Sequence, residues 1–245
     1  MSVRRLTALF AHALLFSVPA FAAKRRAARS APAAAVGTGA CHTFGLVRAG
    51  LVASYHSTAP SGDADFTITY ITDTPTFTHT KQKTTTAQGT ADAETRLDGE
   101  VSGNLRGLKH MNVKVSTVVP FLGAVTTEVD IDFVPTLTLG PAAGWCVGNT
   151  WSVAPVTETI VTRSPAGQQQ QVVTTIGGTG EVLAVGETIT VPGGTFQTVK
   201  YRGTSVSATA VETAITWVSM EHNIVVRQDT VDANGAVTST TVLTK

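Results

Sequence analysis

The side chains that could perform acid–base or metal chemistry are spread thinly along the chain. Histidines beyond the first 22 residues do not stand at the spacing of a helical zinc pair. No serine has the Gly-x-Ser-x-Gly context of a hydrolase nucleophile, and no glycine-rich phosphate loop is present. We therefore predict no catalytic residue, no metal ligand and no cofactor. The histidines considered are His42, His56, His79, His110 and His222.

Three carboxylates at alternate positions are the strongest metal candidate. Glu128, Asp130 and Asp132 share one face of a strand because successive side chains alternate between faces. Oxygen ligands suit calcium, but alternate positions lie about 7 Å apart and no loop glycine accompanies them. The pattern is typical of the solvated outer face of a sheet, and a calcium site is the alternative.

Two arrangements keep an enzymatic function open as an alternative. Glu221 and His222, before Asn223, form the least ordinary polar cluster, which we interpret as a solvated turn between two strands. A hydrolase of envelope polysaccharide could instead take its acid and base from scattered carboxylates facing each other across a cleft at about 5 to 9.5 Å. Sequence spacing does not give that separation, so a non-enzymatic protein is the expectation.

The N-terminus has the pattern of a secretory signal peptide. Arg4 and Arg5 precede an apolar run at residues 6–18, and a small-residue cleavage pattern follows at residues 20–22. The run is shorter than the roughly 20 residues that span a bilayer. We therefore expect cleavage after residue 22, no transmembrane segment in the remaining chain, and a periplasmic or extracellular location.

Residues 23–40 are rich in Ala, Pro and Gly, which predicts a flexible leader before the folded part. The only basic cluster of the exported chain lies here, at residues 24–29. The formal net charge of the full sequence is +1, and loss of the signal peptide leaves the chain close to neutral. Charge therefore gives no argument for a nucleic-acid partner.

The two cysteines, Cys41 and Cys146, both follow the predicted cleavage site. An even number of cysteines in an exported chain favours pairing, because the compartment is oxidising. We predict a disulfide between them, and two free buried thiols are the alternative.

Thr and Val recur from residue 41 to the end, which favours strands because β-branched side chains lose χ1 freedom in helices. Turn formers separate these runs, for example at residues 164–167 and at Asn234-Gly235. We predict a single all-β domain at 41–245, an antiparallel meander sheet curled into a half-barrel, open barrel or sandwich, with very little helix. Residues 77–90 have little apolar content and are predicted to form a solvated edge or a long loop.

A Pro-Gly-Gly sequence interrupts two Thr- and Val-rich runs in the C-terminal half. Pro192 fixes φ at the first central position of a turn, and Gly193 is predicted to take the positive φ of the second position of a type II turn. Gly194 then allows a bulge or a close backbone contact. We interpret the turn as an architectural feature rather than a recognition site.

The C-terminal part of the chain resembles uncharacterised bacterial envelope domains, a domain of unknown function. In these domains a Val-Gly-x-Thr strand leads into a Val-Pro-(Ala/Gly)-Gly-Thr-Phe hairpin, followed by a Trp-bearing strand and a hydrophobic strand ending in Lys or Arg. The resemblance implies a build similar to lipoprotein-carrier half-barrels that enclose an apolar ligand. The usual Pro-Gly turn after the Trp strand is replaced here by residues 220–223. The matching residues are Pro192, Gly194, Thr195, Phe196, Trp217, Val226 and Arg227.

These patterns favour an exported, non-enzymatic binding or structural module of the bacterial envelope. A carrier of a lipid or another apolar ligand is the alternative, because a curved sheet with an apolar inner face can leave a cavity. The apolar hairpin at residues 118–125 is a candidate for the mouth of such a cavity. The expected partners are an apolar ligand or another envelope protein.

Overall fold

The computed structural model describes residues 40–245 apart from residue 88 and residues 103–104, 120–122 and 208–209. The predicted signal peptide and nearly all of the predicted leader lie outside the described residues. Within the part of the chain that the structure describes, every regular element is a strand. No helix there is long and apolar enough to span a bilayer.

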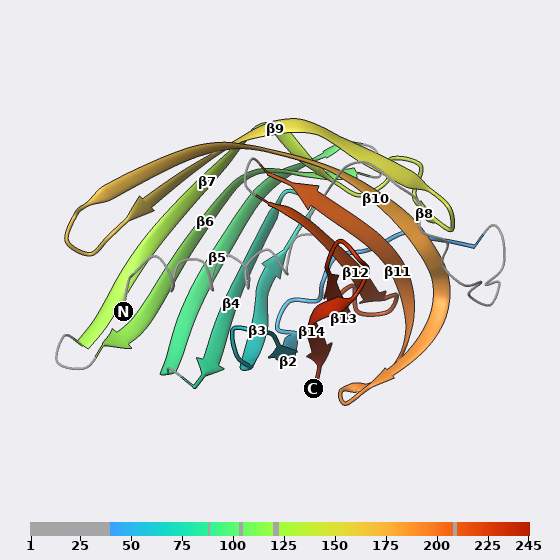
Figure 1. Ribbon diagram of the computed structural model, residues 1–245, viewed down its shortest axis with the longest axis horizontal. Helices are drawn as coiled ribbons and strands as arrows, with labels where there is room; N and C mark the ends of the chain where they lie inside the picture. The colour runs from blue at the N-terminus through green and yellow to red at the C-terminus, as the bar shows by residue number, and fades with distance from the viewer. Residues whose placement is uncertain (1–39, 88, 103–104, 120–122, 208–209) are drawn as a thin grey trace.

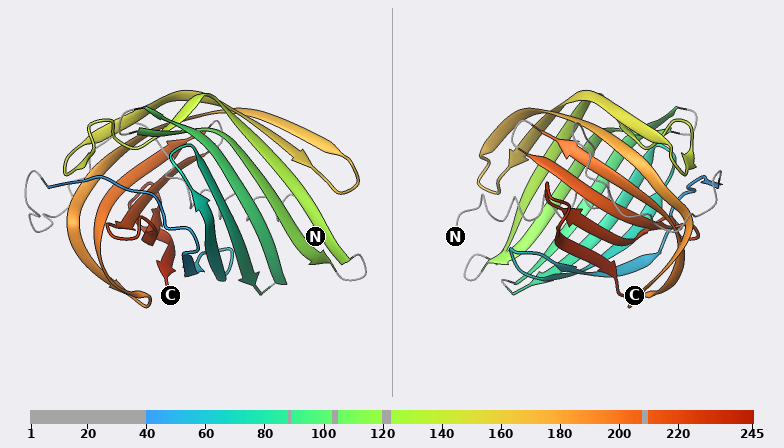
Figure 2. Two further views of the ribbon diagram at one scale, coloured as in Figure 1. Left: turned by 180° about the vertical axis from the view of Figure 1, so that it is seen from behind. Right: turned by 45° about the vertical axis from the view of Figure 1, so that its right-hand side comes forward.

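Twelve strands form one antiparallel sheet, which confirms the predicted all-β fold. Each strand pairs with its neighbours along the chain, and the last strand pairs with the first of the twelve, so the sheet closes into a barrel rather than stopping at a half-barrel. Figures 1 and 2 show the strands wrapping around one interior. The strands are β2 (Val52–Thr58), β3 (Ala64–Asp73), β4 (Phe77–Thr86), β5 (Gly89–Ser102), β6 (Leu105–Val119), β7 (Gly123–Leu139), β9 (Thr150–Arg163), β10 (Gln169–Val191), β11 (Gly194–Val206), β12 (Val211–Ser219), β13 (Val225–Val231) and β14 (Val237–Leu243).

Strand β10 is the longest, with 23 residues, and it changes partner along its length. Its first part pairs with β9 from Gln169 to Glu181, and its second part pairs with β11 from Gly177 to Val191. The β9–β10 hairpin therefore arches over the barrel in Figure 1 before β10 descends beside β11. This change of partner joins the two halves of the sheet.

The inner face of the barrel carries apolar clusters and is polar along β4. Two buried hydrophobic clusters lie inside, one around Trp151, Val199 and Tyr201 and the other around Tyr55 and Phe66.

Along β4 the inward side chains are instead Thr78, Thr80, Gln82 and Thr84, all buried. The predicted solvated edge or long loop at residues 77–90 is therefore wrong, because β4 has a hydrogen-bonded neighbour on each side. Its polar side chains face the interior, where Gln82 Nε2 donates to Thr84 Oγ1 at 2.9 Å.

A disulfide joins Cys41 to Cys146, as predicted, and excludes the free-thiol alternative. The two cysteines lie opposite each other in a small separate sheet of β1 (Cys41–His42) and β8 (Trp145–Cys146). The bond closes a loop with a sequence separation of 105 residues. It attaches the start of the described chain to the segment between β7 and β9.

Residues 40–47, which we call the N-terminal strap, run from this disulfide across one end of the barrel. The Val47 amide donates to Asp73 Oδ2 at 2.7 Å, and the Phe44 ring packs edge-on against Trp145 with ring centroids 5.0 Å apart. The disulfide and these contacts together fix the strap over the interior.

The Pro-Gly-Gly turn is a two-residue connection between β10 and β11, as predicted, but the assignment of its glycines is wrong. The residue with positive φ is Gly194, at 137°, and not Gly193. Gly193 is instead required by a close approach: its amide donates to Leu243 O at 3.0 Å, and a Cβ there would lie 3.0 Å from the same oxygen. The contact with β14 therefore decides which glycine takes which role.

Candidate functional site

A cavity of about 170 Å³ lies at the strap end of the barrel. Its wall is mostly aromatic and aliphatic, and no charged side chain belongs to the lining set found among the described residues. The aromatic members are Phe44, Tyr55, Phe66, Tyr70, Trp145 and Tyr201, the aliphatic members are Ile68, Val218, Ile224 and Val225, and the polar members are Asn223, Gln228 and Thr241.

The strand register explains why side chains so distant in sequence meet here. Tyr201 on β11 is opposite Thr216 on β12, which is opposite Gln228 on β13, which is opposite Thr241 on β14. Directly opposite residues in an antiparallel sheet point to the same face, so these four form one row on the inner wall. The row continues to Ser57 on β2, whose hydroxyl accepts from Thr241 at 3.0 Å.

Gln228 is the residue of this row whose hydrogen bonding is incomplete. Its Nε2 donates to Thr216 Oγ1 at 3.1 Å, and Thr216 also hydrogen-bonds the Tyr201 hydroxyl. The Gln228 side chain is only 8% exposed, and among the described residues its Oε1 has no hydrogen-bond partner. A buried acceptor left without a partner costs about 1 to 3 kcal/mol.

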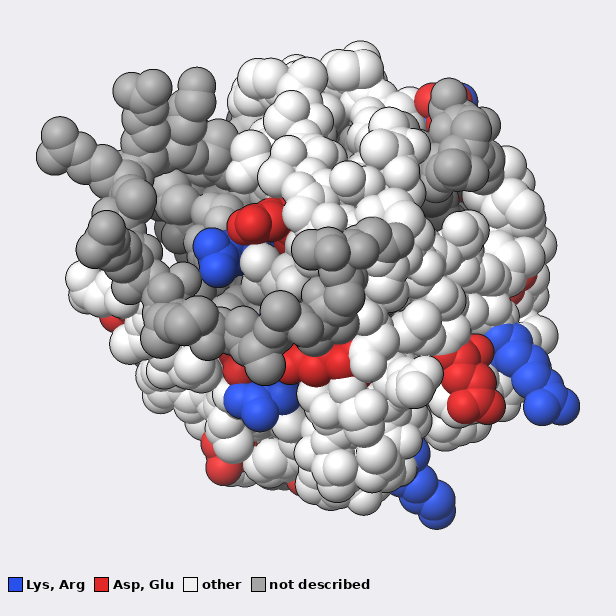
Figure 3. Space-filling model, turned by 90° about the vertical axis from the view of Figure 1, so that its right-hand side faces the viewer, with Lys and Arg blue, Asp and Glu red and all other residues white. Residues whose placement is uncertain are grey.

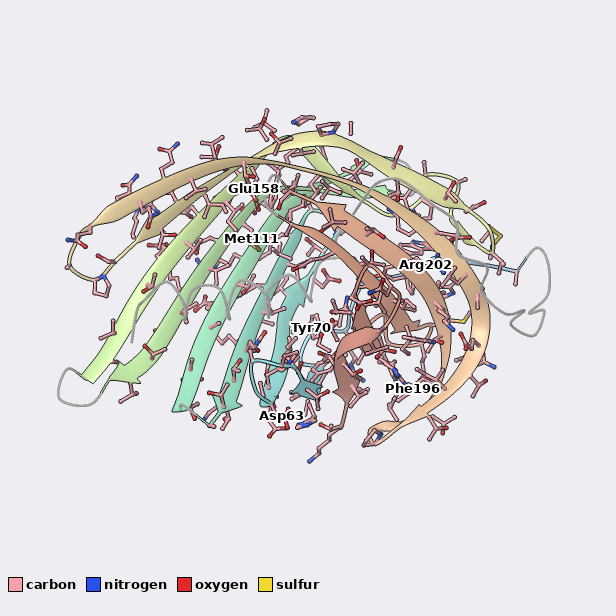
Figure 4. The ribbon with its side chains drawn as sticks, in the orientation of Figure 1. Asp63, Tyr70, Met111, Glu158, Phe196 and Arg202 are labelled. Atoms are coloured by element: carbon pink, nitrogen blue, oxygen red, sulfur yellow. A yellow bond between two sulfur atoms is a disulfide. The ribbon has the colours of Figure 1, made fainter. Side chains whose placement is uncertain are left out.

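Three tyrosines of the wall remain protonated over the physiological pH range. Burial raises the pKa of Tyr201 to about 12, and burial with the nearby Asp73 charge raises the pKa of Tyr70 to about 12. Burial also raises the pKa of Tyr55, with a contribution from Tyr70. Tyr70 projects into the ring of strands in Figure 4, and the phenols of the wall are therefore neutral.

Asn223 links the cavity to the N-terminal strap. Its Oδ1 accepts from the Gly45 amide and its Nδ2 donates to Leu46 O, both at 3.3 Å. Asn223 has a φ of 58°, a left-handed conformation that asparagine tolerates better than most residues. The predicted turn at this position is present, but sequence reasoning missed the role of Asn223 in holding the strap and lining the cavity.

The neighbouring Glu221 and His222 belong to the same turn. Ser219 Oγ accepts from their backbone amides at 3.3 and 3.1 Å. The His222 and Glu221 side chains lie 3.8 Å apart, and neither belongs to the cavity wall.

The three alternate carboxylates lie on β7 and are engaged by cross-strand partners. Asn112 donates to both Glu128 and Asp130, Arg163 pairs with Asp130, and His110 Nδ1 lies 2.8 Å from Asp132 Oδ1. The hydrogen bond from Asn112 is the largest influence that lowers the pKa of Glu128, and Lys114 adds to it. In the described part of the chain no group of three or more His, Cys, Asp or Glu is placed to hold a metal ion.

The one carboxylate on the inner wall of β9 is Glu158. It lies opposite the buried Phe133 of β7, and burial raises the pKa of its carboxyl. Figure 4 shows it beneath the β9–β10 arch. A second cavity of about 160 Å³ contains a single carboxylate, Asp65, which lies 2.8 Å from His56 Nδ1. Neither cavity wall brings two carboxylates together among the described residues.

The face of the molecule seen in Figure 3 is largely uncharged where described residues are visible, with acidic and basic side chains in small separate groups, several of them side by side. On the outside of the barrel near β11, Lys200 and Arg227 both lie over the Trp217 ring, at 4.8 and 5.3 Å from its centroid. Each cation also has a carboxylate partner, Glu187 for Lys200 and Asp229 for Arg227.

No protein-family model and no curated protein matches the chain. Among solved structures, the chain is similar to a candidate lipoprotein from Parabacteroides distasonis, with a TM-score of 0.47 and 15% sequence identity over 84% of this chain and 99% of that one. It is similar to a candidate exported protein with a YmcC-like fold from Bacteroides fragilis, with a TM-score of 0.46 and 14% identity over 84% and 99% of the two chains. Neither likeness assigns a role to a residue of this chain.

Proposed function

We propose that this protein is an exported, non-enzymatic binding module of the bacterial envelope that holds a small, mainly apolar ligand in the cavity at the strap end of its barrel. The single observation that carries the proposal is the cavity itself, whose wall combines six aromatic side chains with an amide oxygen that has no hydrogen-bond partner among the described residues. Ligand sites are typically concave, mostly apolar and supplied with a few polar groups.

Export is supported by the signal-peptide pattern at residues 1–22 and by the Cys41–Cys146 disulfide. Membership in the envelope domains with the Pro-Gly-Gly-Thr-Phe hairpin is part of the same proposal. It is supported by the hairpin between β10 and β11 and by Trp217 on the strand that follows.

The size of the cavity limits what can bind. Pockets for drug-sized ligands measure about 300 to 1,000 Å³, so a cavity of about 170 Å³ is too small for a whole lipid. A small molecule, or one ring of a larger molecule, is the ligand that this volume favours over a complete acyl chain.

Native mass spectrometry of protein purified from its own host tests the proposal. We expect a reproducible mass excess of one small molecule per chain. Val218→Phe fills the cavity from β12 and should reduce that excess, whereas Val237→Phe changes an exposed residue of β14 and should retain it. Ligand-free spectra of the wild type across several preparations would contradict the proposal.

A further inference from the structure

The cavity has the volume of a single ring. An apolar cavity of about 150 Å³ in another protein binds benzene, and the cavity here measures about 170 Å³. Two ring pairs belong to its wall: Tyr55 stacks on Phe66 with ring centroids 5.0 Å apart, and Tyr201 lies tilted against Trp145 with ring centroids 5.2 Å apart. Aromatic side chains in the wall favour an aromatic ligand, because offset and edge-to-face ring contacts add to the burial of apolar area.

Among the polar groups of the wall, one buried acceptor has no hydrogen-bond partner in the described part of the protein. Asn223 is occupied by the strap, and the Thr241 hydroxyl donates to Ser57. Gln228 Oε1 is different, because it is a buried acceptor without a partner in the described part of the protein while its Nε2 is held by Thr216. Gln228 belongs to the cavity wall, and a turn of its side-chain amide that brings the buried Oε1 to the cavity would let a ligand hydroxyl donate to this acceptor.

The charge of the wall excludes an ionic ligand from this fit. The lining set contains no Lys, Arg, Asp or Glu, and burial raises the pKa of its tyrosines, so the described residues of the wall offer no counter-charge at neutral pH. A buried ion without a partner is strongly disfavoured. A monosaccharide would bury several hydroxyls against a wall that is mostly aromatic and aliphatic, whereas a phenol would bury one.

From these three observations we infer that the ligand carries a neutral hydroxylated aromatic ring, a phenol, whose hydroxyl donates to Gln228 Oε1 while the ring packs between the aromatic walls. The inference rests on the proposed function, since it names the chemical class of the ligand that the same cavity holds. It assigns Gln228 as the residue that selects for the hydroxyl.

Isothermal titration of the purified protein with phenol, benzene and glucose tests the inference. The informative quantity is the ratio of the phenol affinity to the benzene affinity, compared between wild type and Gln228→Leu. One net hydrogen bond of about 1 kcal/mol corresponds to about fivefold in affinity, so the ratio should fall about fivefold in Gln228→Leu. Gln82→Leu is the matched control, because Gln82 is also a buried inward glutamine but lies on β4 outside the cavity wall.

The outcomes separate the inference from the proposed function. A ratio that is the same in wild type and Gln228→Leu, or glucose binding tighter than phenol, overturns the inference and leaves a cavity that binds small molecules. Absence of binding by both phenol and benzene to a wild type that is folded by circular dichroism overturns the inference and the proposed cavity ligand together. A fall of the ratio in Gln228→Leu with no fall in Gln82→Leu supports both.

Discussion

Replacing Gly180 with alanine is expected to displace the aromatic wall of the cavity. Gly180 on β10 lies directly opposite Trp151 on β9, and a Cβ at Gly180 would lie 2.1 Å from Trp151 Cζ2. The Trp151 ring lies 5.4 Å from the Trp145 ring and 6.0 Å from the Tyr201 ring, and both of these line the cavity. The added methyl group therefore pushes on a buried ring whose neighbours form the site.

The size of the effect follows from the contacts at two glycines of the same strand. Overpacking a well-packed interior costs about 1 to 3 kcal/mol, which is the destabilisation expected for Gly180→Ala. At Gly177 the nearest atom to an added Cβ is Val153 O at 3.6 Å, an ordinary contact. Gly177→Ala should therefore stabilise by about 0.4 to 1 kcal/mol through the entropy of the unfolded chain.

Urea denaturation followed by circular dichroism measures both variants against the wild type. The expected difference in unfolding free energy between the two variants is about 1.4 to 4 kcal/mol, and the slope of unfolding free energy against urea concentration should not change. Adding Trp151→Phe to Gly180→Ala should recover part of the loss, because the smaller ring leaves room for the methyl group. Equal midpoints for Gly180→Ala and Gly177→Ala would refute the tight packing of Trp151 against β10.

Three further predictions concern the disulfide, the turn and the inner wall. Reduction of Cys41–Cys146 should destabilise the protein by up to about 4.7 kcal/mol, the chain-entropy value for a loop of about 100 residues, and equal urea midpoints with and without reductant would contradict this. Gly194→Ala should cost about 1 to 3 kcal/mol because the φ of 137° is a conformation almost restricted to glycine, whereas Pro192→Ala should cost only about 0.4 to 1 kcal/mol; the reverse order in paired melts would contradict the turn assignment. Burial raises the pKa of Glu158 above its ordinary value of 4.5, so the folded state binds the proton more tightly than the unfolded state. The stability that this carboxyl contributes therefore falls as the pH rises from 4.5 toward the raised pKa of the folded state. Glu158→Gln should therefore gain stability relative to wild type as the pH rises above 4.5, and melts at several pH values that differ between the two proteins by a constant amount would exclude the effect.

Sequence reasoning succeeded where the structure is determined locally. The recurrence of Thr and Val predicted strands, and Asn234-Gly235 and the Pro-Gly-Gly sequence predicted connections between strands that are present. The disulfide followed from the number of cysteines and the signal-peptide pattern. Each of these inferences uses the conformational preference or the chemistry of a few adjacent or paired residues.

Closure of the barrel and the interior position of β4 depend on distant contacts instead. The sheet closes because Leu243 of β14 lies opposite Tyr55 of β2, and no local sequence pattern predicts that pairing. Thr80 and Gln82 are polar, and the sequence therefore predicted a solvated segment around them. Both side chains are buried instead, because the wide interior of a barrel with many strands accepts polar side chains.

The cavity could not be predicted from the sequence, because its wall is assembled from several strands and the strap. Gln228 and Tyr201 meet through Thr216 of β12, which pairs with both of their strands. Asn223 gave one local signal, since asparagine favours the left-handed conformation found there, but its contacts with the strap lie 177 and 178 residues away in sequence. The choice between Gly193 and Gly194 could not be predicted either, because it depends on a contact with Leu243, which belongs to a different strand.

A crystal structure of the protein soaked with phenol would show whether the cavity binds a phenol. One phenol molecule is expected in the cavity of about 170 Å³, with its ring against Tyr55 and Phe66 and its oxygen within hydrogen-bond distance of Gln228 Oε1. Crystals in which Gln228 Oε1 contacts ordered water alone, with no phenol between the aromatic walls, would contradict this expectation.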